Sequence, residues 1–134
     1  MTFGEKAAEL KNTLNCAQSV VVALDELTGL DEATAKAASA GFGGGLRCGE
    51  ACGAYVGAVM SLGLTVGKDG LGKPGQPTAV ACKQLSDEFK ARFGAIRCQD
   101  LLDAAGGDHS VCNGFCAWCA DRVAEMAQEA EKAE

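Results

Sequence analysis

The sequence predicts an all-α protein, folded as a compact single-domain helical bundle of about five to six helices around a central, glycine-rich, buried helix. Three observations support this fold class. The apolar–polar alternation of strands is absent, apolar residues recur at helical spacing, and alanine is abundant. Because 134 residues is the length of one domain, we expect residues 1–134 to form a single cysteine-rich unit.

The first expected helices are bounded by residues that cap helix ends. Residues 4–11 should form a short helix. Asn15, followed three residues later by Gln18, has the form of a capping box and should start a second helix. Gly29 is suited to end that helix, because glycine readily adopts the left-handed conformation found just after helix ends.

The next helix should begin after Asp31, a good N-cap residue, and run to residue 40. The glycine-rich segment 41–45 interrupts it. No strand precedes these glycines, so we interpret them as a tight bend beside Cys48 and Cys52 rather than as a phosphate-binding loop.

Residues 49–64 are expected to form the central helix. The surrounding stretch 51–67 carries no charge, so this helix should be the most buried element. Gly49, Gly53 and Gly57 repeat every four residues and would form a ridge where a neighbouring backbone approaches closely. The stretch falls short of the roughly 20 apolar residues of a membrane span, so we predict a core helix.

The C-terminal half should contain three more helices. Residues 67–77 form a glycine-rich loop, and helices are expected over residues 78–93 and 98–105. Ser110 is the expected cap of the last helix, which should end in a frayed tail over residues 128–134.

Charge and the start of the chain narrow the function classes. The net charge is −6 and there is no basic stripe, so no nucleic-acid partner is expected. The first residues contain no apolar signal segment, which favours a cytoplasmic location. Cysteines there more often serve metal or redox chemistry than structural disulfides. His109, the only histidine, is expected in an exposed turn.

The eight cysteines are the most informative feature of the sequence. Cys16, Cys52 and Cys98 each fall in or near the first turn of an expected helix. The helix dipole there favours thiolate over thiol, and thiolates bind iron or zinc and exchange with disulfides. Three such positions on three helices predict a functional thiol cluster.

The other cysteines leave several interpretations open. Three share one face of the last helix at spacing i, i+4 and i+7: Cys112, Cys116 and Cys119. Redox pairs are conceivable between Cys116 and Cys119 and between Cys48 and Cys52. Cys82 lies in the middle of an apolar helical stripe, so we interpret it as a core thiol.

Four sequence blocks carry a resemblance to a known family. They are NCAQSV (15–20), GFGGGLRCGEACGAYVGAVMSLGL (41–64), FGAIRCQDLL (93–102) and WCADRVAEMA (118–127). In this order they resemble the C_GCAxxG_C_C family of redox-active proteins, whose CGAxxG motif corresponds to Cys52–Gly57. The resemblance covers nearly the whole chain except the 67–77 loop and the tail.

The resemblance implies a set of site residues. The four signature cysteines of the family fall on Cys16, Cys52, Cys98 and Cys119, and Cys112 competes for the fourth place because it lies nearer the helix start. Additional ligands or redox thiols would come from Cys48, Cys112 and Cys116. Backbone N–H groups near Gly49 and Gly53 would hydrogen-bond the sulfur atoms of a cofactor.

The resemblance also implies a cofactor. A similar domain occurs in split-Soret cytochromes, where its cysteines are associated with an iron–sulfur centre. The first hypothesis is therefore an electron-transfer protein with a 2Fe–2S or 4Fe–4S cluster on four thiolates and no substrate chemistry of its own. The second is a metal-free thiol–disulfide protein that uses Cys116/Cys119 or Cys48/Cys52. The third is a structural zinc module with four thiolate ligands.

The expected partner of either redox form is another redox protein, which the sequence does not identify. A homodimer would add buried area, since alanine-rich helices bury little surface each.

Overall fold

The structure is a computed structural model that describes residues 1–133. In this range the chain forms eight α-helices and three short helical turns, without a β-strand. The elements are α1 (Phe3–Leu10), α2 (Cys16–Ala23), α3 (Asp25–Thr28), α4 (Glu32–Ser39), η1 (Ala40–Phe42), η2 (Gly45–Gly49), α5 (Gly53–Thr65), α6 (Pro77–Phe93), α7 (Cys98–Ala104), η3 (His109–Val111) and α8 (Cys112–Lys132). The all-α class is confirmed, but the expected five to six helices are too few.

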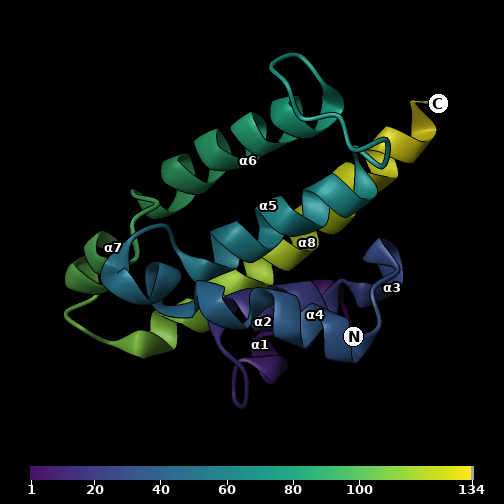
Figure 1. The fold of residues 1–134 in the computed structure, drawn as a ribbon. Coiled ribbons are helices and arrows are strands. Elements are labelled where there is room, and N and C mark those ends of the chain that lie inside the picture. The colour runs from purple at the N-terminus through teal and green to yellow at the C-terminus, as the bar shows by residue number, and fades with distance from the viewer. Residues whose placement is uncertain (134) are drawn as a thin grey trace.

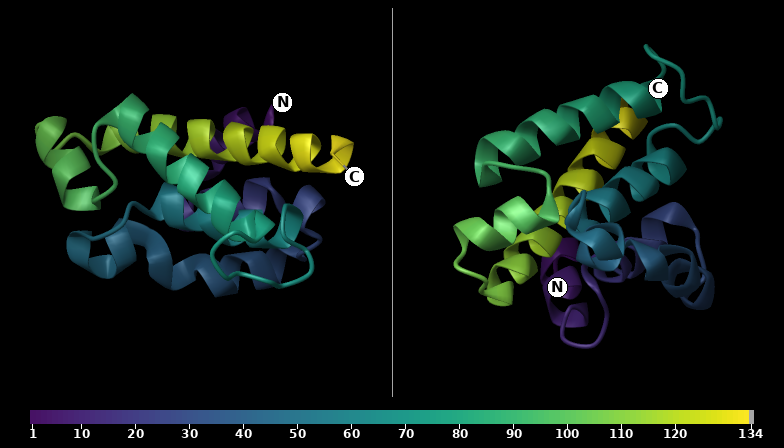
Figure 2. Two further views of the ribbon diagram at one scale, coloured as in Figure 1. Left: turned by 90° about the horizontal axis from the view of Figure 1, so that it is seen from above. Right: turned by 60° about the vertical axis from the view of Figure 1, so that its left-hand side comes forward.

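Helices α5 and α8 lie side by side through the middle of the molecule (Figure 1). Helix α2 packs against α5, and α1 packs against α8 and α2. Helix α6 lies on the other side of α5, as the rotated views also show (Figure 2). The starts of α5 and α8 lie at the end of the bundle where α7 is found, so these helix N-termini gather in one place (Figure 1).

The capping box at Asn15 is confirmed. Its side-chain oxygen accepts a hydrogen bond from the Gln18 N–H at 2.9 Å, and the Gln18 side chain accepts one from the Asn15 N–H at 3.1 Å. The helix that starts here is interrupted at Leu24, whose backbone leaves the helical region (φ −97°, ψ 7°). The remaining turn, α3, ends at Gly29 in a left-handed conformation, as expected.

The central helix α5 begins at Gly53, not at residue 49 as predicted. Gly49 has φ +74° and therefore lies in the preceding turn. A Cβ atom on Gly57 would come within 2.8 Å of the Ala17 carbonyl oxygen, and one on Gly53 within 3.2 Å of the Ala17 nitrogen. Only two of the three glycines thus form the predicted ridge, and α2 lies on it backbone to backbone.

Helix α8 differs from the prediction at both ends. The Asp108 carboxylate, rather than Ser110, is the capping group, because it accepts the Ser110 N–H at 2.9 Å and starts η3. Helix α8 itself begins at Cys112 and continues to Lys132, so residues 128–132 are helical where a frayed tail was expected; residue 134 lies outside the described range.

Aromatic side chains hold α6 against the central pair. The fully buried Phe89 of α6 has four aromatic neighbours with ring centroids 4.9–5.9 Å away. They are Tyr55, Phe93, Phe115 and Trp118. Such contacts add to the area each ring buries, so this cluster fastens α6 to both α5 and α8.

Helix α5 has 13 residues, fewer than the roughly 20 that a membrane span requires. No other helix within residues 1–133 combines the length and the apolar character needed to cross a membrane.

Candidate thiol site

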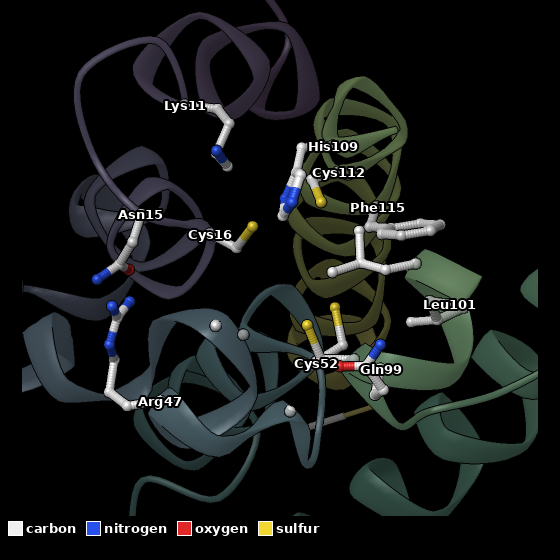
Figure 3. A pocket seen from close by; sticks show the side chains of 15 residues that line it. Lys11, Asn15, Cys16, Arg47, Cys52, Gln99, Leu101, His109, Cys112 and Phe115 are labelled. Carbon is white, nitrogen blue, oxygen red and sulfur yellow. The ribbon is translucent and has the colours of Figure 1, made fainter. Parts of the chain in front are cut away.

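Four cysteines from four segments line one cavity of about 360 Å³. Cys16, Cys98 and Cys112 are the first residues of α2, α7 and α8, and Cys52 is the residue that precedes α5. Figure 3 shows the sulfur atoms of Cys16, Cys52 and Cys112 directed into the same space. The expected convergence of cysteines at helix starts is therefore found for Cys16, Cys52 and Cys98, together with Cys112.

Short local contacts fix the position of each helix start. Asn15 caps α2 and also donates from its side-chain amide to the Ala40 carbonyl oxygen at 2.9 Å, which ties the start of α2 to the segment after α4. An isolated antiparallel bridge joins Ala51 to Arg97. In it the Cys52 N–H donates to the Ile96 carbonyl at 2.8 Å, and the Cys98 N–H donates to the Glu50 carbonyl at 2.6 Å. This bridge places Cys52 beside Cys98.

A left-handed turn forms one edge of the cavity. Gly44, Gly45, Leu46 and Arg47 have φ values of +64°, +63°, +60° and +63°. Glycine adopts this conformation without penalty, but each of the two other residues costs roughly 1–2 kcal/mol. A Cβ on Gly45 would meet the Cys98 Cβ at 2.6 Å, so the turn lies directly on that cysteine. Strain of this kind is typical of functional sites.

The thiols contact one another as well as the cavity. The Cys16 and Cys112 thiols lie close enough for each to shift the pKa of the other. The Cys116 thiol, one turn further along α8 and fully buried, donates to the Cys16 carbonyl oxygen at 3.7 Å. Cys16 therefore stands at the centre of a small thiol network that joins α2 to α8.

Burial and mutual contact outweigh the helix dipole at these thiols. The contact with Cys112 lowers the pKa of Cys16. The contact with Cys116 and burial raise the pKa by more, so the net value is about 12. Burial raises the pKa of Cys52 to about 11 and also raises that of Cys98. The pKa of Cys112 is raised first by its contact with Cys16 and then by burial. Without a bound cation these four groups are thiols at neutral pH, whereas the sequence predicted thiolates.

The remaining cysteines lie away from the cavity surface. Cys119 is fully buried on α8 behind the cavity, and burial raises its pKa well above the ordinary value. Cys48 is exposed, and its thiol donates to the Gly45 carbonyl at 3.6 Å. Cys82 is half-buried on α6. Both glycines expected near the cofactor, Gly49 and Gly53, line the cavity.

The cavity thiols are not arranged to hold a single metal ion. Within residues 1–133, no three His, Cys, Asp or Glu side chains stand close enough to one another to hold one ion as they are placed. The four cavity thiols are thus spread around a space rather than gathered on a point.

Three basic side chains at the cavity were not recognised from the sequence. They are Lys11 at the end of α1, Arg47 in the left-handed turn and His109 at the start of η3 (Figure 3). His109 is exposed, as expected, but it faces the cavity. Arg47 lies in one of the blocks that carry the family resemblance, but Lys11 and His109 lie outside them, and only the fold brings the three together.

One comparison with known proteins gave a match. The family model described as "Putative redox-active protein (C_GCAxxG_C_C)" matches residues 14–131. No curated protein and no solved structure matched the chain. The matched range contains all eight cysteines and every helix except α1. The chain therefore belongs to the C_GCAxxG_C_C family of redox-active proteins.

Proposed function

We propose that this protein transfers electrons through an iron–sulfur cluster held by the thiolates of Cys16, Cys52, Cys98 and Cys112. The observation that carries the proposal is that four cysteines, far apart in the sequence, line one cavity. Iron–sulfur clusters are held by four cysteine thiolates, and the cluster would supply one-electron redox chemistry.

The spacing of the thiols favours a cluster over a structural zinc ion. Zinc–sulfur bonds are about 2.3 Å, so four tetrahedral ligands lie roughly 4 Å apart. The described residues contain no three candidate donors arranged for one ion. A cluster distributes its ligands over several iron atoms and suits a more widely spaced set.

Cys112 is better placed than Cys119 to be the fourth ligand of the cluster. The Cys112 side chain lines the cavity and contacts Cys16, whereas Cys119 is fully buried and absent from the cavity wall. Cys119 lies two turns further along the same face of α8, so it would reach the cavity only if the helix shifted along its axis. Such a shift would disturb Phe115 and Trp118, whose rings pack on α6.

The chain's own residues perform three tasks in this proposal. The four thiols release their protons on binding iron, because thiolate is the ligand form. Backbone N–H groups at the start of α5 already act on the Cys52 sulfur and would stabilise its anion. Leu101, Leu102 and Phe115 form an apolar wall that limits water at the sulfur atoms.

A second candidate rests on the contact between Cys16 and Cys112. Two neighbouring thiols that line one cavity can join as a disulfide, with two electrons and two protons passing to an external oxidant such as a low-molecular-weight disulfide. This pair differs from those expected from the sequence. The Cys116/Cys119 pair is fully buried, so no partner disulfide reaches it without local opening.

The test is iron and sulfide analysis of protein produced and purified without oxygen, combined with visible absorption and electron paramagnetic resonance spectra. We expect stoichiometric iron and sulfide, with loss of most bound iron in single Ser variants of Cys16, Cys52, Cys98 and Cys112. Cys119→Ser and Cys82→Ser are the controls and should retain iron.

Protein without iron under these conditions rules out the cluster. Retention of iron by Cys112→Ser together with its loss from Cys119→Ser would move the fourth ligand to Cys119. If iron is absent, a reversible disulfide between Cys16 and Cys112, identified by peptide mapping, would support the second candidate.

A further inference from the structure

The cavity is cationic although the protein is acidic. Acidic residues outnumber Lys and Arg by 18 to 12 in the whole chain. The 15 residues that line the cavity nevertheless include Lys11, Arg47 and His109 and no Asp or Glu. These three side chains come from three separate segments, so local sequence bias does not explain their convergence.

Three acidic residues that are sequence neighbours of cavity-lining residues already have partners. Glu50 and Asp100 both pair with Arg97, at 3.6 and 3.1 Å. The Asp108 carboxylate accepts the Ser110 N–H at 2.9 Å, and this hydrogen bond, with the nearby His109, lowers its pKa. By contrast, the structure records no ion pair for Lys11, Arg47 or His109 within residues 1–133. The positive charges of Lys11 and Arg47 and the ring N–H of His109 remain available to a ligand.

Backbone strain keeps Arg47 at the cavity. Arg47 and its neighbour Leu46 both adopt left-handed φ values that side-chain-bearing residues avoid. The folded chain thus accepts an unfavourable turn that directs a long cationic side chain toward Asn15 across the opening (Figure 3).

Apart from these basic side chains, much of the cavity wall is apolar, and only a few polar groups lie at its edge. Leu101, Leu102 and Phe115 supply the apolar surface, and Asn15 and Gln99 add amide groups at the edge. A concave apolar site with a few placed polar groups is the usual form of a small-molecule site, and a volume of about 360 Å³ suits a small ligand.

We propose that the opening of this cavity binds a small organic anion, whose acidic group contacts Lys11, Arg47 and His109 and whose apolar part packs on Leu101, Leu102 and Phe115. The acidic group is a carboxylate or a phosphate, since both accept hydrogen bonds from cationic side chains. This site goes beyond the proposed electron transfer and does not require a bound cluster, because its polar contacts are with the rim and not with the sulfur atoms.

The test uses His109 as a reporter, since it is the only histidine and gives a single set of ring resonances. The full-length, metal-free reduced protein is titrated at constant ionic strength with benzoate, phenyl phosphate and the uncharged analogue benzamide. We expect saturable shifts of the His109 ring signals with at least one of the two anions and none with benzamide. The tighter anion identifies the acidic group.

Charge variants locate the contact. Lys11→Gln and Arg47→Gln should each weaken binding of the tighter anion by roughly two- to fivefold, the range expected for a partly exposed ion pair. Lys36→Gln and Lys83→Gln are matched controls, because they remove the same charge from exposed pairs with Glu32 and Asp87 on α4 and α6. They should leave the affinity unchanged.

Three results would overturn the proposal: absence of saturable shifts with both anions, equal shifts with benzamide, or equal weakening by the control variants. Iron content is measured separately on protein purified without oxygen. If the chain loads iron but does not bind the anions, only the anion site is refuted. If the chain binds an anion but never loads iron, only the cluster is refuted.

Discussion

The two ends of the contact between α8 and the rest of the bundle are built on different principles. Near Cys112, the start of α8 meets three other helix starts around an open cavity with thiols, cations and a strained turn. Near Phe115 and Trp118, the same helix is closed against α6 by interlocking aromatic rings, with an ion pair between Arg122 and Glu88 beyond them. We infer that burial in the aromatic region stabilises the fold and offsets the unfavourable features at the thiol end.

This comparison explains how the thiol end can tolerate unfavourable features. Protonated, crowded thiols and left-handed non-glycine residues each reduce stability, so a functional site of this kind depends on apolar burial elsewhere.

Phe89→Ala should cause the largest loss of stability. Phe89 is fully buried and contacts four other rings, so its removal leaves a cavity at the centre of the aromatic cluster. We expect a decrease of about 3–5 kcal/mol in the free energy of unfolding, measured by urea denaturation. Cys112→Ser at the thiol end is the comparison and should cost clearly less. Similar losses in the two variants would contradict the assignment of stability to the aromatic region.

Gly57→Ala should destabilise the protein by roughly 1–3 kcal/mol, because the new methyl group would lie 2.8 Å from the Ala17 carbonyl and force α2 and α5 apart. Gly63→Ala is a matched control on the same helix, where the nearest atom is 3.9 Å away. The control should gain up to about 1 kcal/mol, since alanine is the better helix former. Both are measured by urea denaturation, and a stabilised Gly57→Ala variant would show that the helices do not approach as described.

Alkaline pH should weaken the thiol end. The folded-state pKa values of Cys52 and Cys16, about 11 and 12, exceed the ordinary 9.0, so the stability gained from their protonated forms is complete below pH 9.0. It is lost as the pH rises through the folded-state values. The free energy of unfolding of the reduced, metal-free protein should therefore fall above pH 9.0. Cys52→Ser should fall less steeply; identical slopes in the two proteins would contradict the prediction.

Acidic pH should weaken the contact between α6 and α8, by a smaller amount. The hydrogen bonds from Arg122 lower the pKa of Glu88 below its ordinary 4.5, so this stabilisation is present above pH 4.5 and is lost as the pH falls through the lower folded-state value. At neutral pH, Glu88→Gln should cost about 0.5–1 kcal/mol, since the pair is only partly buried. As the pH falls below the folded-state pKa of Glu88, the variant and the wild type should converge in thermal unfolding. A constant difference over the whole acid range would exclude the ion pair as its cause.

The sequence was most informative where a residue acts through its own backbone neighbours. The capping box at Asn15 and the end of a helix at Gly29 follow from local stereochemistry, and the structure contains both of them. Predictions failed where a distant contact decides the backbone. Gly49 leaves the central helix because the neighbouring segment pairs with residues 96–98, which no local pattern reveals.

For the cysteines, too, local features were predictable from the sequence, whereas features that depend on distant contacts were not. The chain by itself determined that Cys16, Cys52 and Cys98 lie at helix starts, because helix boundaries are set by short-range propensities and caps. Only the tertiary structure decided that Cys112, rather than Cys119, lines their cavity, since both lie on one face of α8 and the choice depends on where that helix lies along its axis. It also brought Lys11, Arg47 and His109 together, because the field at a site sums charges from segments whose proximity exists only in the packed fold.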